Sequence, residues 1–144
     1  MSASPPEFDW NEIQRSAGPY PLEAFAFVRE GLGYTVDQVH DPEGTVTAGS
    51  LPGPEGEIDQ HVSGQELCMG LRDFAIRQYG MLAGVVLRHW HVNRTDDFGR
   101  IVFAMIEHGM MAKNDRDSLE DFRSVFDFDE EFAPDRVLSR LSRN

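Results

Sequence analysis

The chain contains a single cysteine, Cys68, and no run of about eighteen apolar residues. One cysteine cannot form an internal disulfide. Without a long apolar run, no membrane-spanning helix is expected. The N-terminus, Met-Ser-Ala-Ser-Pro-Pro, also lacks the basic and apolar regions of a signal peptide. These absences predict a cytoplasmic protein that does not bind membranes.

Basic residues are scarce, since 13 Lys and Arg stand against 25 Asp and Glu, for a net charge of −12. Phosphate contacts need clustered Lys and Arg, so this balance argues against broad affinity for nucleic acid. The charge is unevenly distributed. Five Arg and three Asp between Arg72 and Arg100 leave a local balance of +2, whereas eight acids and one Arg between Asp117 and Asp135 leave −7. Such an acid-rich segment is typical of solvated surface.

The remaining composition is that of an ordinary globular protein, with 144 residues, 40% hydrophobic and 26% charged. This length is enough for one domain with a real core. We expect a tail and short helix over residues 1–20, one helical domain over 21–132, and a basic tail or short helix over 133–144. Residues 41–60 are rich in Pro and Gly turn dipeptides and predict a mobile loop.

The first strong helical pattern begins at Pro21. Apolar residues then recur at spacings of three and four, which places them on one helical face: Leu22, Phe25, Val28, Leu32, Val36 and Val39. Gly31 and Gly33 each weaken this helix by roughly 1 kcal/mol relative to Ala. They either allow another backbone to come close or mark a bend.

A second helix begins with Ser63-Gly64-Gln65-Glu66, the pattern of a capping box. In a capping box the Ser63 hydroxyl accepts from the Glu66 amide, and the Glu66 carboxylate reaches back to the Ser63 amide. Gly80 is expected to end this helix. A third helix is predicted from Met81 to Trp90, with Leu82, Val85, Val86 and Trp90 facing inward.

The fourth predicted helix runs from Thr95, as its cap, to a stop at Gly109. Asp96 and Asp97 occupy its first turn, where the helix dipole favours negative charge. Beyond Gly109, the aromatic residues Phe122, Phe126 and Phe128 either form a returning strand or pack as separate anchors.

This order of three short helices, a glycine stop and a short hairpin-like segment is typical of a winged helix-turn-helix. We therefore predict a mainly α fold, with a winged helix-turn-helix-like half and a small β-hairpin as the wing. The helix from Thr95 would then be the recognition helix, whose N-terminal end meets base edges or phosphate. Asp96 and Asp97 would repel phosphate at that end.

Several segments together resemble the Minf uncharacterised repeat-protein family of bacteria. They are His61 to Cys68, Gly70 to Phe74, Thr95 to Gly99, Ile101 to Phe103, Glu120 to Phe122 and Phe27 to Thr35. The resemblance covers most of residues 22–132. It implies no catalytic residues, because the family has no established activity. His91 departs from the family pattern, which favours Gly there.

The candidate chemical sites have simpler structural explanations. The two histidines of His89-Trp90-His91 would point to different sides of a helix, which disfavours a metal site. The acids after Asp127 lack the glycine and the distal glutamate of an EF-hand loop. Cys68 with His61 would make a nucleophile pair, but Cys68 lies on an apolar stripe and is expected to be buried. We therefore predict no catalytic residue, no metal and no cofactor.

We expect a non-enzymatic adaptor that binds a protein partner or a second copy of itself. Its candidate contact residues are Arg72, Arg77, Arg88, Arg94 and Arg100. The alternative is a winged-helix regulator that binds DNA or RNA, which the net charge, Asp96 and Asp97 all disfavour.

Overall fold

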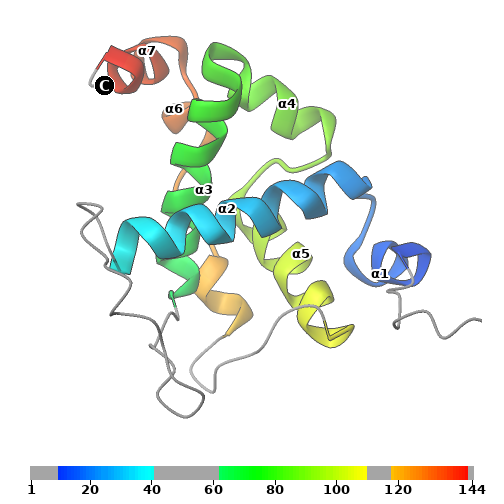
Figure 1. Cartoon of the computed structure of the whole chain (residues 1–144). Coiled ribbons are helices and arrows are strands. Elements are labelled where there is room, and N and C mark those ends of the chain that lie inside the picture. The colour runs from blue at the N-terminus through cyan, green and yellow to red at the C-terminus, as the bar shows by residue number, and fades with distance from the viewer. Residues whose placement is uncertain (1–9, 41–61, 110–117, 143–144) are drawn as a thin grey trace, which may run out of the picture.

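The computed structural model describes residues 10–40, 62–109 and 118–142, and these residues form a mainly helical fold (Figure 1). No strand occurs among them. None of their helices is both long and apolar enough to cross a bilayer. In chain order the elements are α1 (Trp10–Ala17), α2 (Leu22–His40), α3 (Gly64–Tyr79), the 3-10 turn η2 (Gly80–Leu82), α4 (Ala83–His89), α5 (Thr95–Glu107), the 3-10 turn η3 (Leu119–Phe122), α6 (Phe128–Glu131) and α7 (Pro134–Ser142).

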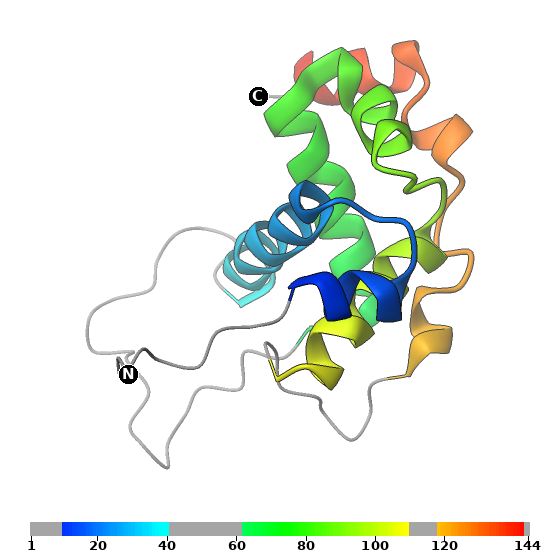
Figure 2. The ribbon, with the colours of Figure 1, turned by 90° about the vertical axis from the view of Figure 1, so that its right-hand side faces the viewer.

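Helices α2 and α3 cross in close contact because each presents a glycine to the other. A Cβ on Gly31 would overlap Cδ2 of Leu71, and a Cβ on Gly70 would overlap the hydroxyl of Thr35. The Thr35 hydroxyl turns back to its own helix and donates to the Gly31 carbonyl at 2.7 Å. In Figure 2, α2 is foreshortened as it crosses α3. Of the two glycines in α2, only Gly31 serves a close approach, since a Cβ on Gly33 would meet nothing within 4 Å.

Helix α5 is the most enclosed element, with an almost continuous set of buried residues. They are Thr95, Asp97, Phe98, Gly99, Ile101, Val102, Ala104 and Met105. The neighbouring helices α1 and α2 and the turn η3 pack against it. Both end helices reach the same core, since Ile13 of α1 and Val137 of α7 are fully buried.

The start of α3 confirms the predicted capping box. The Ser63 amide donates to the Glu66 carboxylate at 2.9 Å, and the Glu66 amide donates to the Ser63 hydroxyl at 3.0 Å. Gly80 follows the last residue of α3 with a positive φ of 57°, as the predicted stop requires.

The inward face predicted for the third helix is correct for Trp90, which is buried, and for Val86, which packs against the core, but wrong for Leu82 and Val85. Leu82 is 61% exposed and Val85 is 53% exposed, whereas Ala83, Gly84 and Leu87 are buried. The positive φ of Gly80 and the 3-10 turn that follows rotate the chain before α4 begins. If one regular helix is counted from Met81, its periodicity therefore places Leu82 and Val85 on the buried side, although both face solvent.

The predicted cap of α5 is also wrong in its details. Helix α5 begins at Thr95, but the Thr95 hydroxyl donates to the Phe122 carbonyl at 2.6 Å and accepts from the Val125 amide at 3.0 Å. The helix start is instead capped by Asp97, whose carboxylate accepts from the Asn93 and Arg94 amides. Thr95 thus ties the segment after η3 to α5.

The predicted wing is not supported. Phe122 ends the 3-10 turn η3, and Phe128 begins the short helix α6. The rings of Phe126, Phe128 and Phe132 pack together at centroid distances of 5.1 to 6.0 Å. These residues are aromatic anchors of the core, the other arrangement that the sequence allowed. Residues 110–117 of the expected hairpin, and the whole of the expected loop 41–60, lie outside the described residues.

Candidate functional site

At the N-terminal end of α5, the Asp97 carboxylate accepts hydrogen bonds from other segments of the chain. Asp97 is 7% exposed, and its Oδ1 accepts from the Tyr20 hydroxyl at 2.5 Å. Its Oδ2 accepts from the Asn93 amide at 2.8 Å and the Arg94 amide at 3.2 Å. Burial and then the bond to Asp97 raise the pKa of the Tyr20 hydroxyl. The part of α5 that is not buried is a narrow stripe whose charged residues are Asp96, Arg100 and Glu107, so it carries more negative than positive charge and is poorly suited to a phosphate backbone.

Two of the five candidate arginines, Arg94 and Arg100, lie at this end of α5. Both are exposed. The Arg100 guanidinium lies 3.8 Å from Asp97 Oδ1, and this carboxylate partly neutralises the charge of Arg100. They are therefore placed beside the Tyr20–Asp97 bond, away from the corner where α3 meets α4.

Arg72 has a structural role. It is 7% exposed, and its guanidinium contacts Asp73 at 3.0 Å and Glu131 at 3.3 Å. Glu131 also pairs with Arg136 and Arg140 of α7, each at 3.1 Å. This ion-pair network joins α3 to α6 and α7, so Arg72 is not available as a surface contact.

Arg77 and Arg88 lie on either side of an exposed apolar corner in the sequence. Arg77 is in the last turn of α3, with its guanidinium 5.6 Å from the centre of the Tyr34 ring. Arg88 is exposed in the last turn of α4. Between them come Met81, Leu82 and Val85, which are 46%, 61% and 53% exposed.

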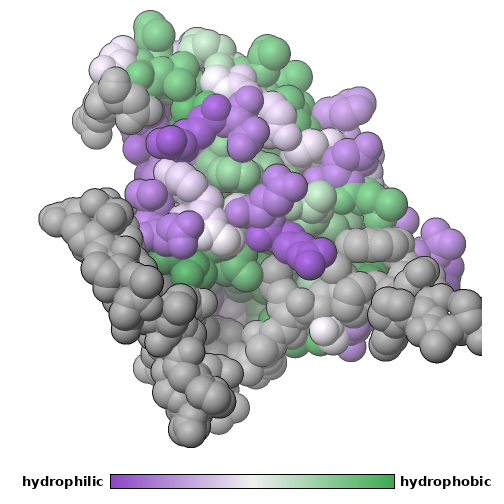
Figure 3. Space-filling model, in the orientation of Figure 1, coloured by the Kyte–Doolittle hydropathy of each residue, from purple (hydrophilic) through white to green (hydrophobic). Residues whose placement is uncertain are grey.

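We call these three residues, together with Leu138 of α7, the apolar face. Leu138 is 57% exposed, and α7 packs against η2. Figure 3 shows hydrophobic surface along the top edge of the molecule, over α7 and over the corner where α3 meets α4. Four of the eight exposed large hydrophobic side chains of the described residues are in this face. Single exposed apolar side chains are ordinary, but a gathered group marks an interaction site.

Sequence reasoning assigned Leu82 and Val85 to the core and so missed the apolar face. One signal was nevertheless present in the sequence. Between Asp73 and Asp96 there is no Asp or Glu, although the chain carries 25 of them. A long stretch without acids in an acidic protein indicates a surface whose local charge differs from that of the rest of the molecule.

A cleft with a volume of about 770 Å³ lies between the α1–α2 connection and the end of α4. His89 and His91 both line it, because α4 ends at His89 and His91 then takes a positive φ of 67°. The expectation assumed that both histidines lie in one helix, and that assumption is wrong, because His91 lies beyond the end of α4. No group of three His, Cys, Asp or Glu side chains suited to a metal ion occurs in the part of the chain that the structure describes.

The candidate nucleophile Cys68 is fully buried in α3. Burial raises the pKa of its thiol, and the negative charge of Asp96 raises it further. A neutral, enclosed thiol is a poor nucleophile. His61 lies outside the described residues, and Ser63 is engaged as the cap of α3.

We predict that Cys68 resists alkylation in the native protein. Iodoacetamide at neutral pH should modify it at least about a hundredfold more slowly than in denaturant, because reaction requires local unfolding and a thiolate. Mass spectrometry of timed samples measures both rates. Native labelling as fast as that of the unfolded chain would contradict the burial of this thiol.

Comparisons of the chain with protein-family models, with curated proteins and with solved structures found no match. The resemblance to the Minf family stays a prediction.

Proposed function

We propose that this chain is a non-enzymatic protein-binding module that contacts its partner through the apolar face. The observation that carries the proposal is the gathering of Met81, Leu82, Val85 and Leu138 at one corner of the molecule. Leaving such residues in water is unfavourable by about 1.5 to 3 kcal/mol for each side chain that a partner would fully cover. Their exposure is thus explained if a partner covers them.

The rigidity of this corner also supports the proposal. Ala83 and Leu87, on the opposite side of α4, are fully buried, and Gly84 lies close to Phe132 of the aromatic group. The apolar face is therefore presented by elements that are already packed against the core: η2, α4 and α7. Binding to an ordered surface avoids much of the entropy cost of association.

The alternative, a winged-helix regulator of DNA or RNA, has less support. Its recognition helix would be α5, which is enclosed, and Arg72 is committed to ion pairs. We expect no mobility shift with duplex DNA or structured RNA even at low salt, where phosphate contacts are strongest.

We expect a photo-crosslinking amino acid at position 82 to trap a protein partner in the source cells. Leu82 is replaced by p-benzoylphenylalanine, and adducts are separated by mass and identified by mass spectrometry. The expected result is a discrete adduct that forms only under illumination, because an exposed apolar side chain at a binding site lies within reach of the partner.

Leu119 is the matched control, since it is 51% exposed but lies in η3. η3 packs against the first turn of α3, at the end opposite to the apolar face, where Asp121 and Phe122 contact Gly64. The same replacement at Leu119 should trap nothing discrete. Equal adducts from both positions, or none from position 82, would rule the proposal out.

A further inference from the structure

The surface around the apolar face carries positive charge, in contrast to the rest of the chain. Between Asp73 and Asp96 the chain has three charged residues, and all are arginines: Arg77, Arg88 and Arg94. Arg94 lies beyond α4, so Arg77 and Arg88 are the two that flank the apolar face in the sequence. The net charge of the whole chain is −12. At physiological ionic strength, charges more than about 8 Å away across water are largely screened, so a partner here meets mainly the local arginines.

Helix α7 adds two more arginines to this surface. Arg136 and Arg140 both pair with Glu131, and Arg140 also lies 3.9 Å from Asp73. Arg72, Arg136 and Arg140 are thus held in ion pairs with Asp73 and Glu131. Arg77 and Arg88 are exposed and form no ion pair within the part of the chain that the structure describes, so they supply the uncompensated positive charge beside the apolar face.

One of these arginines has an unused donor. The Arg140 Nε is buried and has no hydrogen-bond partner among the described residues. A buried donor without a partner is unfavourable by about 1 to 3 kcal/mol, and most such groups in proteins are satisfied.

Arg140 and Arg77 line the same small pocket, which lies between α2, α3 and α7. Its volume is about 230 Å³, and its walls are Tyr34, Gln38, Asp73, Ile76, Arg77, Arg140 and Leu141. The Tyr34 ring contacts the Arg77 guanidinium. We call it the arginine pocket. Its Arg140 is already paired with Asp73 and Glu131, so the guanidinium that it offers to an incoming carboxylate without an ion pair of its own is that of Arg77.

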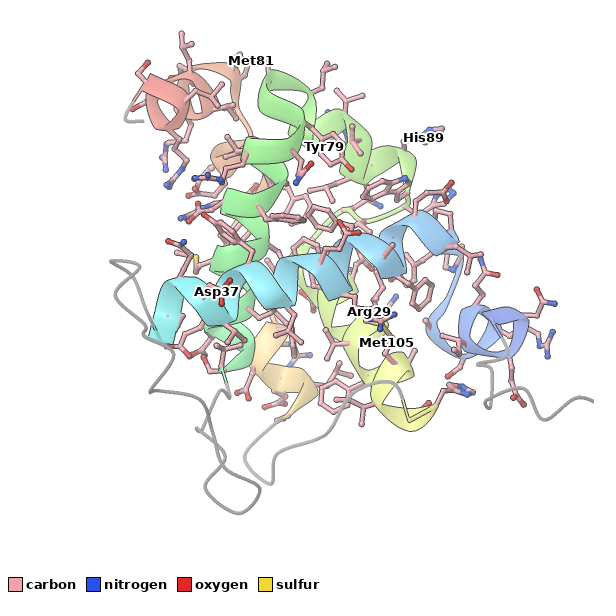
Figure 4. The ribbon with its side chains drawn as sticks, in the orientation of Figure 1. Arg29, Asp37, Tyr79, Met81, His89 and Met105 are labelled. Carbon is pink, nitrogen blue, oxygen red and sulfur yellow. The ribbon has the colours of Figure 1, made fainter. Side chains whose placement is uncertain are left out.

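The arginine pocket and the apolar face share the elements α3 and α7. Arg77 lies in the last turn of α3, and Met81 follows in η2. Figure 4 places Met81 at the top of α3 beside α7, whereas Asp37 and Arg29 lie lower, on α2. One short segment of a partner is long enough to contact both features.

We propose that the partner presents an acidic amphipathic segment, whose apolar residues cover the apolar face and whose carboxylate enters the arginine pocket. This inference rests on the proposed function and names the chemistry of the partner. Symmetric pairing with a second copy would instead place this positively charged surface against the same surface of the other copy, which is unfavourable. A nucleic acid would leave the apolar face uncovered.

The test uses three synthetic helical peptides with one shared apolar face and different residues elsewhere: Glu in the first, Gln in the second and Lys in the third. Fluorescence anisotropy measures binding to the full chain. The Glu peptide should bind about tenfold more tightly than the Lys peptide, because two to three favourable pairs replace repulsive ones. Added salt should reduce this difference.

Charge reversal of the protein should reverse this preference. The double variant Arg77→Glu, Arg88→Glu is expected to favour the Lys peptide. Arg123→Glu is the matched control, since Arg123 is 70% exposed and follows η3, and it should keep the preference for Glu. Equal binding of all three peptides, or a preference that Arg77→Glu, Arg88→Glu does not alter, would overturn the acidic partner.

A third variant separates this inference from the proposed function. Leu82→Asn, Val85→Asn should abolish binding of every peptide. If the peptides bind equally and this variant releases them, the apolar face binds proteins but the partner is not acidic. If no peptide binds, or if duplex DNA binds more tightly than the Glu peptide, the inference is wrong, and the crosslinks from position 82 then decide the proposed function alone.

Discussion

Replacing Gly70 by Ala should destabilise the protein by about 3 kcal/mol, the upper end of the usual overpacking penalty. The added Cβ would overlap the Thr35 hydroxyl and lie 2.6 Å from Thr35 Cγ2 and 2.7 Å from its Cβ. Thr35 cannot rotate away freely, because it is 1% exposed and its hydroxyl donates to the Gly31 carbonyl. Helices α2 and α3 would have to separate. Thermal unfolding followed by circular dichroism should show a melting temperature lower by about 10 °C.

Gly33→Ala is the matched control in the partner helix. A Cβ at this position meets no atom within 4 Å. The change should therefore stabilise the protein by about 0.5 to 1 kcal/mol, since Ala loses less conformational entropy than Gly in a helix. If Gly70→Ala and Gly33→Ala shift the melting temperature in the same direction, the close crossing of α2 and α3 is not present in solution.

Replacing Asp97 by Ala should cost about 3 to 4 kcal/mol of folding free energy. The change leaves the buried Tyr20 hydroxyl and the Asn93 and Arg94 amides without their acceptor. Unsatisfied buried donors cost about 1 to 3 kcal/mol each, and part of this cost is relieved where water enters. Urea unfolding at neutral pH measures the change from the shift in midpoint.

Two further variants apportion this effect. Tyr20→Phe removes one donor and should cost only about 1 to 1.5 kcal/mol, because Asp97 keeps both amides. Asp96→Ala should cost less than about 1 kcal/mol, since Asp96 accepts only an exposed bond from the Ser124 amide at 3.2 Å. A cost for Asp96→Ala equal to that for Asp97→Ala would show that a general charge effect, and not the buried bonds, holds the start of α5.

The helices that were predicted correctly are those with strong local signals. α2 begins and ends within a residue or two of its predicted bounds, and α3 begins at its capping box and ends at Gly80. These signals depend on residues three or four positions apart, which the sequence displays directly. The predictions failed where a turn of different geometry intervened, as at η2, because helical periodicity does not continue through such a turn.

Only some of the candidate contact residues could be predicted from local sequence signals of this kind. Arg77 and Arg88 were named from their charge, and both are exposed beside the apolar face. Arg72 was named on the same ground, but it is buried because Glu131, far along the chain, meets it. Charge counted along the sequence cannot distinguish a free arginine from one that is already paired.

The sequence by itself determined that the chain is mainly helical, where α2 and α3 begin and end, and that acids are missing between Asp73 and Asp96. These properties follow from local backbone chemistry and composition. The tertiary structure alone decided which side of α4 faces water, which arginines remain free, and that Asp97 meets Tyr20, 77 positions earlier. Such contacts arise only when distant segments pack together, because the burial of one face is settled by what lies against it.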